Sequence, residues 1–421
     1  MSAPTYCGLD FGTSNSTLGL IQNGKPFLVP LEGKEITIPS TLFFDFEENS
    51  VHFGRDAIGT YMEGGEGRMM RALKSILGSP TIYETTMIGR NREPFTAVLG
   101  LFLSHMKKQA ETLTAEPITH VVMGRPVHFV DYNPDADQEA ESTLRAIASD
   151  CGFKHIEFEY EPVAAARDFQ QIAKRREVAL IIDIGGGTSD FTILNVEPNG
   201  PASNRANQSI LANAGVHVGG TDFDRWLSLS RIMPLLGYQS PMHKEGRLMP
   251  VGYYHDLATW QKINSLYDHK TRTDLRYLRR EAKEPHLIDR LLQLLDLREG
   301  HHLALGVENC KVTLSHQNET DMALDFIEKD LSAFMTQDHL IDALKDGTEQ
   351  VRQTIAEALN AAGLAGEDIS IVFLTGGSTK IPHVRESLTA MAPNATIIDG
   401  DAFGSVGIGL ALEAQKRFSY E

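Results

Sequence analysis

The sequence predicts an α/β protein built from two related lobes, each with a mixed β-sheet flanked by helices. Short apolar runs typical of buried strands alternate with longer helical patterns. The turn that begins at Asp10 returns in similar form at Asp183, each time between two strand-like runs. A strand that ends in a glycine turn also occurs twice, at Gly124 and at Gly376. These repeats indicate an internal duplication, with the two halves facing each other across a cleft.

The first lobe, assigned to residues 1–172, opens with an antiparallel meander over residues 5–31. Asn23 and Gly24 form the strongest two-residue hairpin signal in this stretch. The other elements follow in chain order: helical patterns from 55 to 115, including 69–77 and 95–113, a buried strand over 118–123, and a helix over 135–151 that stops at Gly152.

The second lobe, residues 173–421, repeats this plan. Strands are expected over 178–182 and 191–196 on either side of the second turn, a later strand over 369–375, and a C-terminal helix over about 403–418. A mainly helical insertion spans about 227–315, with helices over 275–283 and 287–297 separated at Pro285. Its basic residues form either a docking face or a solvated helix surface; they are Arg276, Arg279, Arg280, Lys283, Arg290 and Arg298.

Composition narrows the possible partners. The chain has 421 residues, 42% of them hydrophobic, and a formal net charge of −17, which disfavours nucleic acid and anionic lipid over most of the surface. No apolar run approaches the ~20 residues of a membrane span, and the N-terminus lacks a signal-peptide pattern. Three widely spaced cysteines argue against disulfides and zinc. We therefore expect a cytoplasmic monomer with no membrane or nucleic-acid partner.

The second turn has the composition of a phosphate-binding loop. Gly185, Gly186 and Gly187 would let backbone N–H groups approach an anion without hindrance from Cβ atoms. Neither a P-loop nor a dinucleotide-binding fingerprint is present, and a strand follows the glycines instead of a helix. We therefore expect the phosphate cradle to be a hairpin turn.

An aspartate stands at the start of each turn. Mg²⁺ needs only one or two carboxylates in addition to phosphate oxygens, so Asp10 and Asp183 suit Mg²⁺ bound to a nucleotide. Either aspartate alone could simply bond neighbouring backbone N–H groups in a turn. Their occurrence in the same frame favours the ligand interpretation. Hydroxyls of Thr13, Ser14 and Thr188 could bond phosphate oxygens or position water.

Five motifs together carry a family resemblance. They occupy residues 9–15, 161–166, 182–190, 219–224 and 374–382. In this order they resemble the ATPase domain of DnaK-type heat-shock chaperones, in the actin, hexokinase and heat-shock ATPase superfamily, and most closely the short YegD-type members. The resemblance covers essentially the whole chain and implies the actin-like (ribonuclease H-like) ATPase fold, with ATP or ADP and Mg²⁺ as cofactors.

The resemblance also implies roles for individual residues. Lys74 falls where the family has its catalytic lysine, which positions the attacking water and stabilises developing charge. Glu161 would polarise that water with support from Asp190, while Asp10 and Asp183 would hold Mg²⁺ through its waters. The phosphates would lie among Gly12, Thr13, Ser14, Asn15, Gly185, Gly186, Gly187, Thr188, Gly219 and Gly220. The adenosine would contact Glu308, Lys311, Ser315, Gly376, Gly377, Ser378 and Lys380, with Asp401 nearby.

The sequence departs from the family pattern at several places. Val312 and Lys380 stand where some members have arginine, which would weaken adenine stacking, and Thr221 replaces a glutamate. The sequence ends at Glu421 without the interdomain linker and peptide-binding domain of full-length members. Client binding is therefore not expected to carry over.

Three functions remain open on this evidence. The first is a slow Mg²⁺-dependent ATPase that couples its nucleotide to lobe closure as a chaperone-like switch. The second is a small-metabolite kinase or phosphotransferase of the same superfamily, which would need an acceptor pocket and a general base. The third is a non-hydrolysing nucleotide-binding or filament-forming protein.

Overall fold

The computed structural model describes all residues except 1–5, 171–175, 197–208, 401–403 and 420–421. The chain divides into two compact units. Unit 1 consists of Met1–Gly220, Glu349–Thr379 and Val384–Glu421, and unit 2 consists of Thr221–Thr348 and Lys380–His383. The predicted division into lobes at residues 172 and 173 stays a prediction.

The first sheet of unit 1 has the strand order β11-β10-β1-β2-β3, with β4 (Ile38–Pro39) paired to β2. Its strands are β1 (Tyr6–Asp10), β2 (Asn15–Gln22), β3 (Lys25–Leu28), β10 (His120–Arg125) and β11 (His155–Tyr160). The predicted meander is confirmed, since β1, β2 and β3 are antiparallel neighbours. Asn23 and Gly24 both have positive φ, 52° and 76°, as a tight two-residue hairpin requires.

The second sheet of unit 1 repeats the topology of the first. Its order is β14-β13-β12-β17-β18. The strands are β12 (Glu177–Ile184), β13 (Ser189–Val196), β14 (Ser209–Val216), β17 (Ile371–Thr375) and β18 (Thr396–Asp399). β12 is antiparallel to β13 and parallel to β17, just as β1 is antiparallel to β2 and parallel to β10. This shared strand order confirms the internal duplication.

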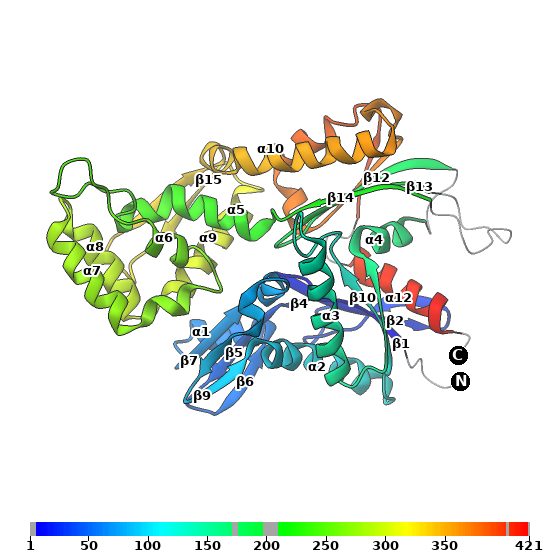
Figure 1. Ribbon diagram of the computed structural model, residues 1–421, viewed down its shortest axis with the longest axis horizontal. Coiled ribbons are helices and arrows are strands. Elements are labelled where there is room, and N and C mark those ends of the chain that lie inside the picture. The colour runs from blue at the N-terminus through cyan, green and yellow to red at the C-terminus, as the bar shows by residue number, and fades with distance from the viewer. Residues whose placement is uncertain (1–5, 171–175, 197–208, 401–403, 420–421) are drawn as a thin grey trace. The chain divides into compact units, whose positions relative to one another are not determined.

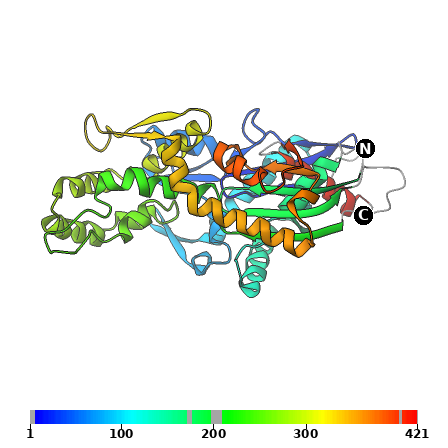
Figure 2. The same ribbon diagram turned by 90° about the horizontal axis from the view of Figure 1, so that it is seen from above.

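Helices flank these sheets. α2 (Phe95–Thr114) and α3 (Pro134–Asp150) lie beside the first sheet in Figure 1. Figure 2 shows the later part of α10 (Gln337–Ala362) running across the strands of the second sheet, next to α11 (Pro382–Thr389). The helix predicted over 135–151 is confirmed, and Gly152 after it has a left-handed φ of 91°.

Two further helices pack closely on the sheets and on each other. They are α4 (Glu161–Gln170) and α12 (Ser405–Phe418). A Cβ atom on Gly8 would lie 2.2 Å from the Ala411 nitrogen, and one on Gly409 would lie 1.8 Å from the Ala164 oxygen. Only glycine at these positions lets α12 contact both β1 and α4 at this distance. The first residue of α4 is the predicted catalytic Glu161, so this packing fixes one member of the site.

A smaller sheet follows the meander and corrects one prediction. β5 (Thr41–Asp45) pairs with β6 (Ser50–Phe53) and β7 (Gly67–Arg71), α1 (Gly54–Met62) follows β6, and β8 (Thr85–Ile88) pairs with β9 (Asn91–Pro94). The helix predicted over 69–77 is wrong. This stretch finishes β7, turns at Ala72 with a φ of 56°, and makes a short 3₁₀ turn, Leu73–Ile76. Pairing with β5 decides the conformation of an apolar run too short for its periodicity to be diagnostic.

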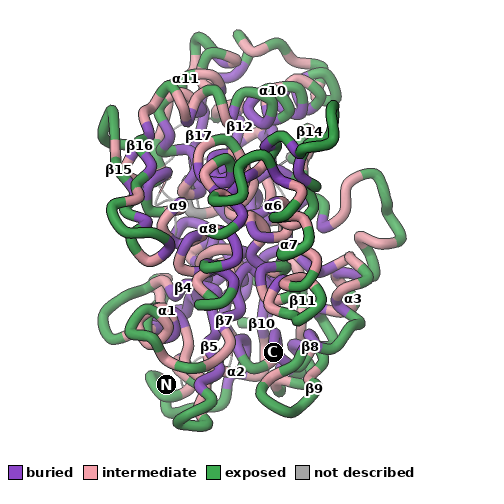
Figure 3. The backbone as a smooth tube through the Cα atoms, turned by 90° about the vertical axis from the view of Figure 1, so that its left-hand side faces the viewer, coloured by how far each residue is buried: buried purple, intermediate pink, exposed green. Residues whose placement is uncertain are grey.

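The strands form the buried interior of unit 1. In Figure 3 the tube is mostly buried along β12 and β17, whereas many of the connecting segments are exposed. One apolar cluster joins residues of β1 and β2 to α2 and α3, and another joins β12 and β17 to α4 and α12. The strand ends that carry the predicted site residues are therefore anchored in two packed cores.

Unit 2 is mainly helical, as predicted for the insertion. Its helices are α5 (Gly220–Leu227, whose first residue belongs to unit 1), α6 (Gly252–Leu257), α7 (His269–Glu281), α8 (Pro285–Asp296) and α9 (Gly300–Leu314), and β15 (Glu319–Ala323) pairs with β16 (Ser332–Thr336). Pro285 opens α8, as its missing N–H allows. Within the described ranges, no helix is both long enough and apolar enough to cross a membrane.

The basic residues of α7 and α8 are partly engaged within unit 2. Arg279 pairs with Asp289 on the neighbouring helix, and Arg290 pairs with Glu328 at 2.6 Å. These ion pairs support a solvated surface for the two arginines rather than a docking role.

Candidate active site

Ser40 holds the first turn in place. The turn connects β1 to β2 and starts at Asp10, the last residue of β1. The Ser40 hydroxyl donates to the Gly12 carbonyl at 2.7 Å, and the Ser40 N–H donates to the Ser14 carbonyl at 2.9 Å. Ser40 is buried and also bonds the Ser16 hydroxyl at 2.9 Å. The role of Ser40 is not visible in the sequence, because no local pattern links it to a turn 25 or more residues away.

The second turn is a hairpin, as the sequence predicts. It joins the antiparallel strands β12 and β13. The Gly185 N–H donates to the Thr188 carbonyl at 3.0 Å, and the Gly220 N–H donates to the Gly185 carbonyl at 2.9 Å. The motif at residues 219–224 therefore supports the glycine turn through its backbone.

The two turns lie against each other. A Cβ atom on Gly186 would come within 2.2 Å of the Ser14 hydroxyl oxygen, and one on Gly187 within 2.9 Å of the Thr13 hydroxyl oxygen. A Cβ atom on Gly219 would lie 2.6 Å from the Gly187 nitrogen. Glycine is thus required at these positions by turn-to-turn packing as well as by any approach of a phosphate. This contact brings together the two motifs that the sequence identified as a repeat.

Five charged side chains converge on these turns. Lys74, from the 3₁₀ turn after β7, forms an ion pair with Glu161 at the start of α4. Asp10 is the last residue of β1, and Asp183 is the last but one of β12. Asp190 lies on β13. Lys74, Glu161, Asp183 and Asp190 are each at most 8% exposed. The structure therefore gathers every residue that was predicted to be catalytic, with Thr188 hydrogen-bonded to Asp190.

This environment disfavours the ionised carboxylates. Burial, reinforced by the negative charge of Glu161, raises the pKa of Asp10 to about 7 and that of Asp190 to about 7. The same causes, together with Asp190 and Asp10, raise the pKa of Asp183 well above its ordinary value. Burial opposes the charge on Lys74, but Glu161 and Asp10 outweigh it and raise the pKa of the lysine. Lys74 therefore stays cationic.

The charge balance of the site suits a bound cation. Four carboxylates face one ammonium, and the charge of Lys74 opposes the rise in the pKa of Asp10, Asp183 and Asp190. Carboxylate oxygens are ligands that Mg²⁺ accepts, directly or through its own waters. A divalent cation would supply the missing positive charge, so the donor set fits Mg²⁺.

A backbone amide outside the predicted set also binds an acid of the site. The Val127 N–H donates to the Asp190 carboxylate at 2.6 Å, and both groups are buried. Val127 follows the glycine turn at the end of β10. The sequence pattern pairs this turn with the one at Gly376 but gives Val127 no role. The repeat was therefore the signal that could have identified it.

The glycine turn after β17 lies beside Asp183. Gly376 has a φ of 82°, and a Cβ atom there would be 2.2 Å from the Ile184 carbonyl oxygen and 2.8 Å from an Asp183 carboxylate oxygen. The Thr379 hydroxyl donates to the Gly376 carbonyl at 2.7 Å. Gly377 and Ser378 continue into a short 3₁₀ turn, Gly377–Lys380. Part of the predicted adenosine motif is thus fixed against a predicted Mg²⁺ residue.

Four other predicted adenosine residues, Glu308, Lys311, Ser315 and Lys380, belong to unit 2. Glu308 and Lys311 lie on α9, and Ser315 follows its last residue and donates to the Lys311 carbonyl at 3.1 Å. Lys311 is buried and pairs with Asp224 at 2.8 Å, so its charge is compensated inside this unit. Lys380 lies on the short segment that unit 2 takes from the region after β17. Asp401 lies outside the described residues, and adenosine contacts remain predictions for all of these positions.

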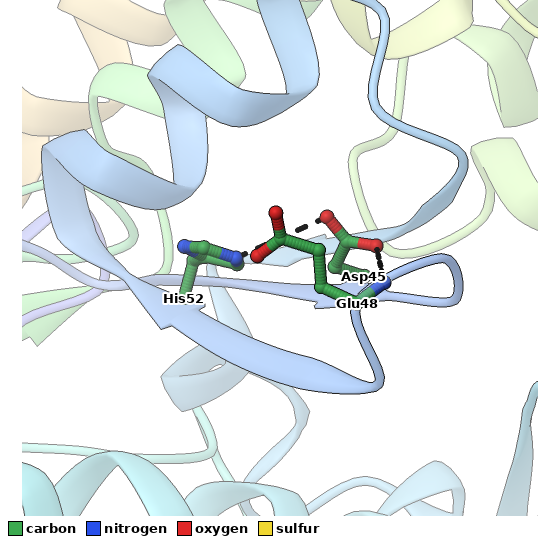
Figure 4. Close-up of side chains that lie close together, drawn as sticks. All are labelled: Asp45, Glu48 and His52. Carbon is green, nitrogen blue, oxygen red and sulfur yellow. Dashed lines mark hydrogen bonds and ion pairs between the residues drawn. The ribbon is translucent and has the colours of Figure 1, made fainter.

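A second cluster of possible metal ligands lies on the β5–β6 hairpin. Asp45, Glu48 and His52 place their ligand atoms within 4.8 Å of one another, as Figure 4 shows. Existing partners account for this arrangement, because Asp45 accepts the N–H groups of Glu47 and Glu48 at 2.8 Å and His52 bonds Asp56 at 2.7 Å. Glu48 is exposed, and these contacts stabilise the hairpin without any need for a metal ion.

The duplicated sheets and the paired glycine turns define an ATPase fold of the actin-like class. A family model described as "Hsp70 protein" matches residues 78–230 and 267–415, more than half of the chain. The chain belongs to the Hsp70 family, as the resemblance of its motifs implied.

Curated relatives agree with this assignment. The chain is 25% identical to the "Chaperone protein DnaK" of Mycoplasmopsis pulmonis over 98% of its length and 58% of the relative. It is 26% identical to that of Thermoplasma volcanium over 96% of its length and 57% of the relative, and 24% identical to that of Metamycoplasma hominis over 97% and 59%. The chain therefore spans a little over half the length of the relatives it matches.

Proposed function

We propose that this chain binds Mg²⁺-ATP and hydrolyses it slowly, as a chaperone-type ATPase of the DnaK kind. The observation that carries the proposal is the convergence of four acids, three of them buried, and Lys74 on two glycine turns that lie against each other. Membership of the Hsp70 family supports ATP as the nucleotide.

One group of residues would bind Mg²⁺ and the phosphates. Asp10 and Asp183 would hold Mg²⁺ through its waters. Mg²⁺ would neutralise charge on the phosphate oxygens when bound. The backbone N–H groups of residues 185–187 and the hydroxyls of Thr13, Ser14 and Thr188 would bind the phosphates, with Gly12, Asn15, Gly219 and Gly220 shaping the turns.

Lys74 and Glu161 would act on the attacking water. Their ion pair fixes both side chains in a buried environment, where an ammonium stabilises developing negative charge more strongly than in water. Glu161 would accept a hydrogen bond from the water and orient it. Asp190, held by the Val127 N–H, would support Glu161. The chain thereby supplies positioning and electrostatic stabilisation, which dominate phosphoryl transfer.

Adenosine binding and the coupled motion complete the proposal. We assign Glu308, Lys311, Ser315, Gly376, Gly377, Ser378, Lys380 and Asp401 to the adenosine. Nucleotide-dependent closure would make the chain a switch in the cytoplasm, acting as a monomer on clients or co-chaperones that stay unidentified.

Phosphate release from ATP tests this function against its alternatives. Purified protein with Mg²⁺-ATP and no added metabolite should release phosphate, and calorimetry should show binding of both ATP and ADP. ADP formation only after a small-molecule acceptor is added, with the phosphoryl group recovered on that acceptor and no free phosphate, would overturn the ATPase proposal in favour of a kinase. Nucleotide binding without release, together with light scattering that rises with Mg²⁺-ATP, would instead indicate a filament-forming protein.

A further inference from the structure

Arg125 occupies an unusual position next to the site. It is the last residue of β10, it is 8% exposed, and Pro126 follows it. A buried arginine needs its charge compensated and its N–H groups bonded, because an unpaired guanidinium is costly away from water. The proposed reaction assigns it no role.

The guanidinium of Arg125 has four side-chain partners. It donates to Asp137 and to Glu141, two acids of α3, at 2.6 Å each. Its central carbon also lies over the rings of Phe129 and Tyr160, 5.1 Å and 5.3 Å from the ring centres. Few rotamers of Arg125 could satisfy all four contacts, so the group is held in one orientation.

The segment after β10 is wrapped around this guanidinium. Arg125 donates to the Pro126 carbonyl at 3.1 Å and to the Val127 carbonyl at 3.4 Å. The Phe129 N–H donates to Asp137, the same acid that binds the arginine, at 2.5 Å. The peptide groups of residues 126–129 are thus oriented by Arg125 and by its partner on α3.

Two connections lead from this assembly into the site. The Val127 N–H, in the wrapped segment, donates to the Asp190 carboxylate at 2.6 Å. Tyr160, whose ring the guanidinium contacts, directly precedes Glu161 and pairs with Arg125 in the β10–β11 ladder. One side chain therefore contacts residues that adjoin two of the acids around Lys74, Asp190 and Glu161.

We propose that Arg125 is a positioning residue for the ATPase site: it fixes the Val127 amide against Asp190 and the Tyr160 ring beside Glu161. The inference rests on the proposed ATPase function for its kinetic consequence. Its structural part, the coupling of Arg125 to the Val127 amide, can be measured without any turnover.

Arg145 provides a matched control for an Arg125→Gln variant. It also lies on the α3–β11 interface, where it binds Glu141 at 3.2 Å and lies over the Phe158 ring at 4.9 Å. Its side chain is 45% exposed, and none of its contacts in the described structure involves residues 126–129 or Tyr160. An Arg145→Gln variant therefore removes an arginine from the same interface without disturbing the segment that leads to the site.

Kinetics give the first readout. Arg125→Gln should lower kcat about 10- to 100-fold, because small misplacements of catalytic groups have effects of this size, and change nucleotide affinity less than about threefold. Arg145→Gln should stay within about threefold of the unchanged protein in both quantities. A loss of kcat equal in both variants would overturn the positioning role.

Hydrogen exchange gives a readout that does not depend on ATP hydrolysis. The Val127 amide should exchange at least about tenfold faster in Arg125→Gln than in the unchanged protein, and not in Arg145→Gln. Unaltered exchange at Val127 would refute the inference even if the ATPase proposal is correct. If the unchanged protein has no ATPase activity but the Val127 amide still exchanges faster in Arg125→Gln, the coupling of Arg125 to Val127 is supported and only the proposed function is refuted. Arg125→Lys, which keeps the charge but loses the planar fork, replaces Arg125→Gln if that variant does not fold.

Discussion

Replacing Lys74 with alanine is the sharpest test of the site. The ammonium is buried, pairs with Glu161, and faces Asp10 and Asp190 as well. Removing one well-placed charge-stabilising donor costs about 3–4 kcal/mol of transition-state stabilisation, equivalent to a fall in kcat of about 10²- to 10³-fold. Binding of Mg²⁺-ATP should be retained, since the proposed Mg²⁺ residues and phosphate turns are left in place.

The same change should affect folding in a way that a double variant can isolate. Lys74→Ala leaves the buried Glu161 without its partner, which typically costs about 3–5 kcal/mol of unfolding free energy. Protonation of neighbouring carboxylates whose pKa is already raised reduces this cost. Lys74→Met combined with Glu161→Gln removes both charges, so it should recover most of the stability without recovering turnover.

Single-turnover phosphate release, nucleotide calorimetry and urea unfolding would measure these three quantities. Lys107→Ala is the matched control, because Lys107 is 13% exposed and pairs with Glu111 at 2.5 Å on α2. That variant should lose stability but keep kcat within about threefold. The reasoning is refuted if Lys74→Ala hydrolyses ATP at the unchanged rate, or if the Lys74→Met, Glu161→Gln protein regains turnover along with stability.

Three further predictions concern the same turns. Burial raises the pKa of Asp10 and of Asp190 to about 7, above the ~3.9 of an unfolded chain, so the folded protein holds protons that the unfolded one releases. Stability without nucleotide should therefore fall as pH rises from about 4 to about 7 and then level off, which urea midpoints at about pH 5.5 and about pH 8 would show; equal midpoints would contradict it. Gly376→Ala should destabilise more than Gly363→Ala, because both have positive φ but a Cβ at Gly363 meets open space; similar melting temperatures would argue against the contact with Asp183. Ser40→Ala should cost about 1–2 kcal/mol and weaken Mg²⁺-ATP binding, as its hydroxyl holds the first turn; unchanged affinity by calorimetry would show that the turn needs no such support.

The duplication could be predicted from sequence because short motifs of similar composition recur in both halves, at Asp10 and Asp183 and at Gly124 and Gly376. The Asn23 and Gly24 hairpin and the long helix starting at Phe95 depend on turn chemistry and on periodicity over many residues, and both are confirmed. The stretch over 69–77 failed because a short apolar run fits a strand or a helix equally well. Its pairing with β5, in which Arg71 lies opposite Thr41, decided the conformation, and local pattern carries no information about such a distant partner.

The sequence by itself determined which residue types belong to the site: acids at strand ends, glycines between them, and, through the family resemblance, Lys74. Only the tertiary structure decided how they act on one another. Burial and mutual repulsion raise the pKa of Asp10, Asp183 and Asp190, and these effects depend on distances across elements that are far apart in the chain. The same holds for Ser40, Val127 and Arg125, which support the site from elsewhere in the chain. The repeat at Gly124 marks the turn before Val127 but not its partner, and Ser40 and Arg125 have no recognisable spacing, so these contacts follow from packing.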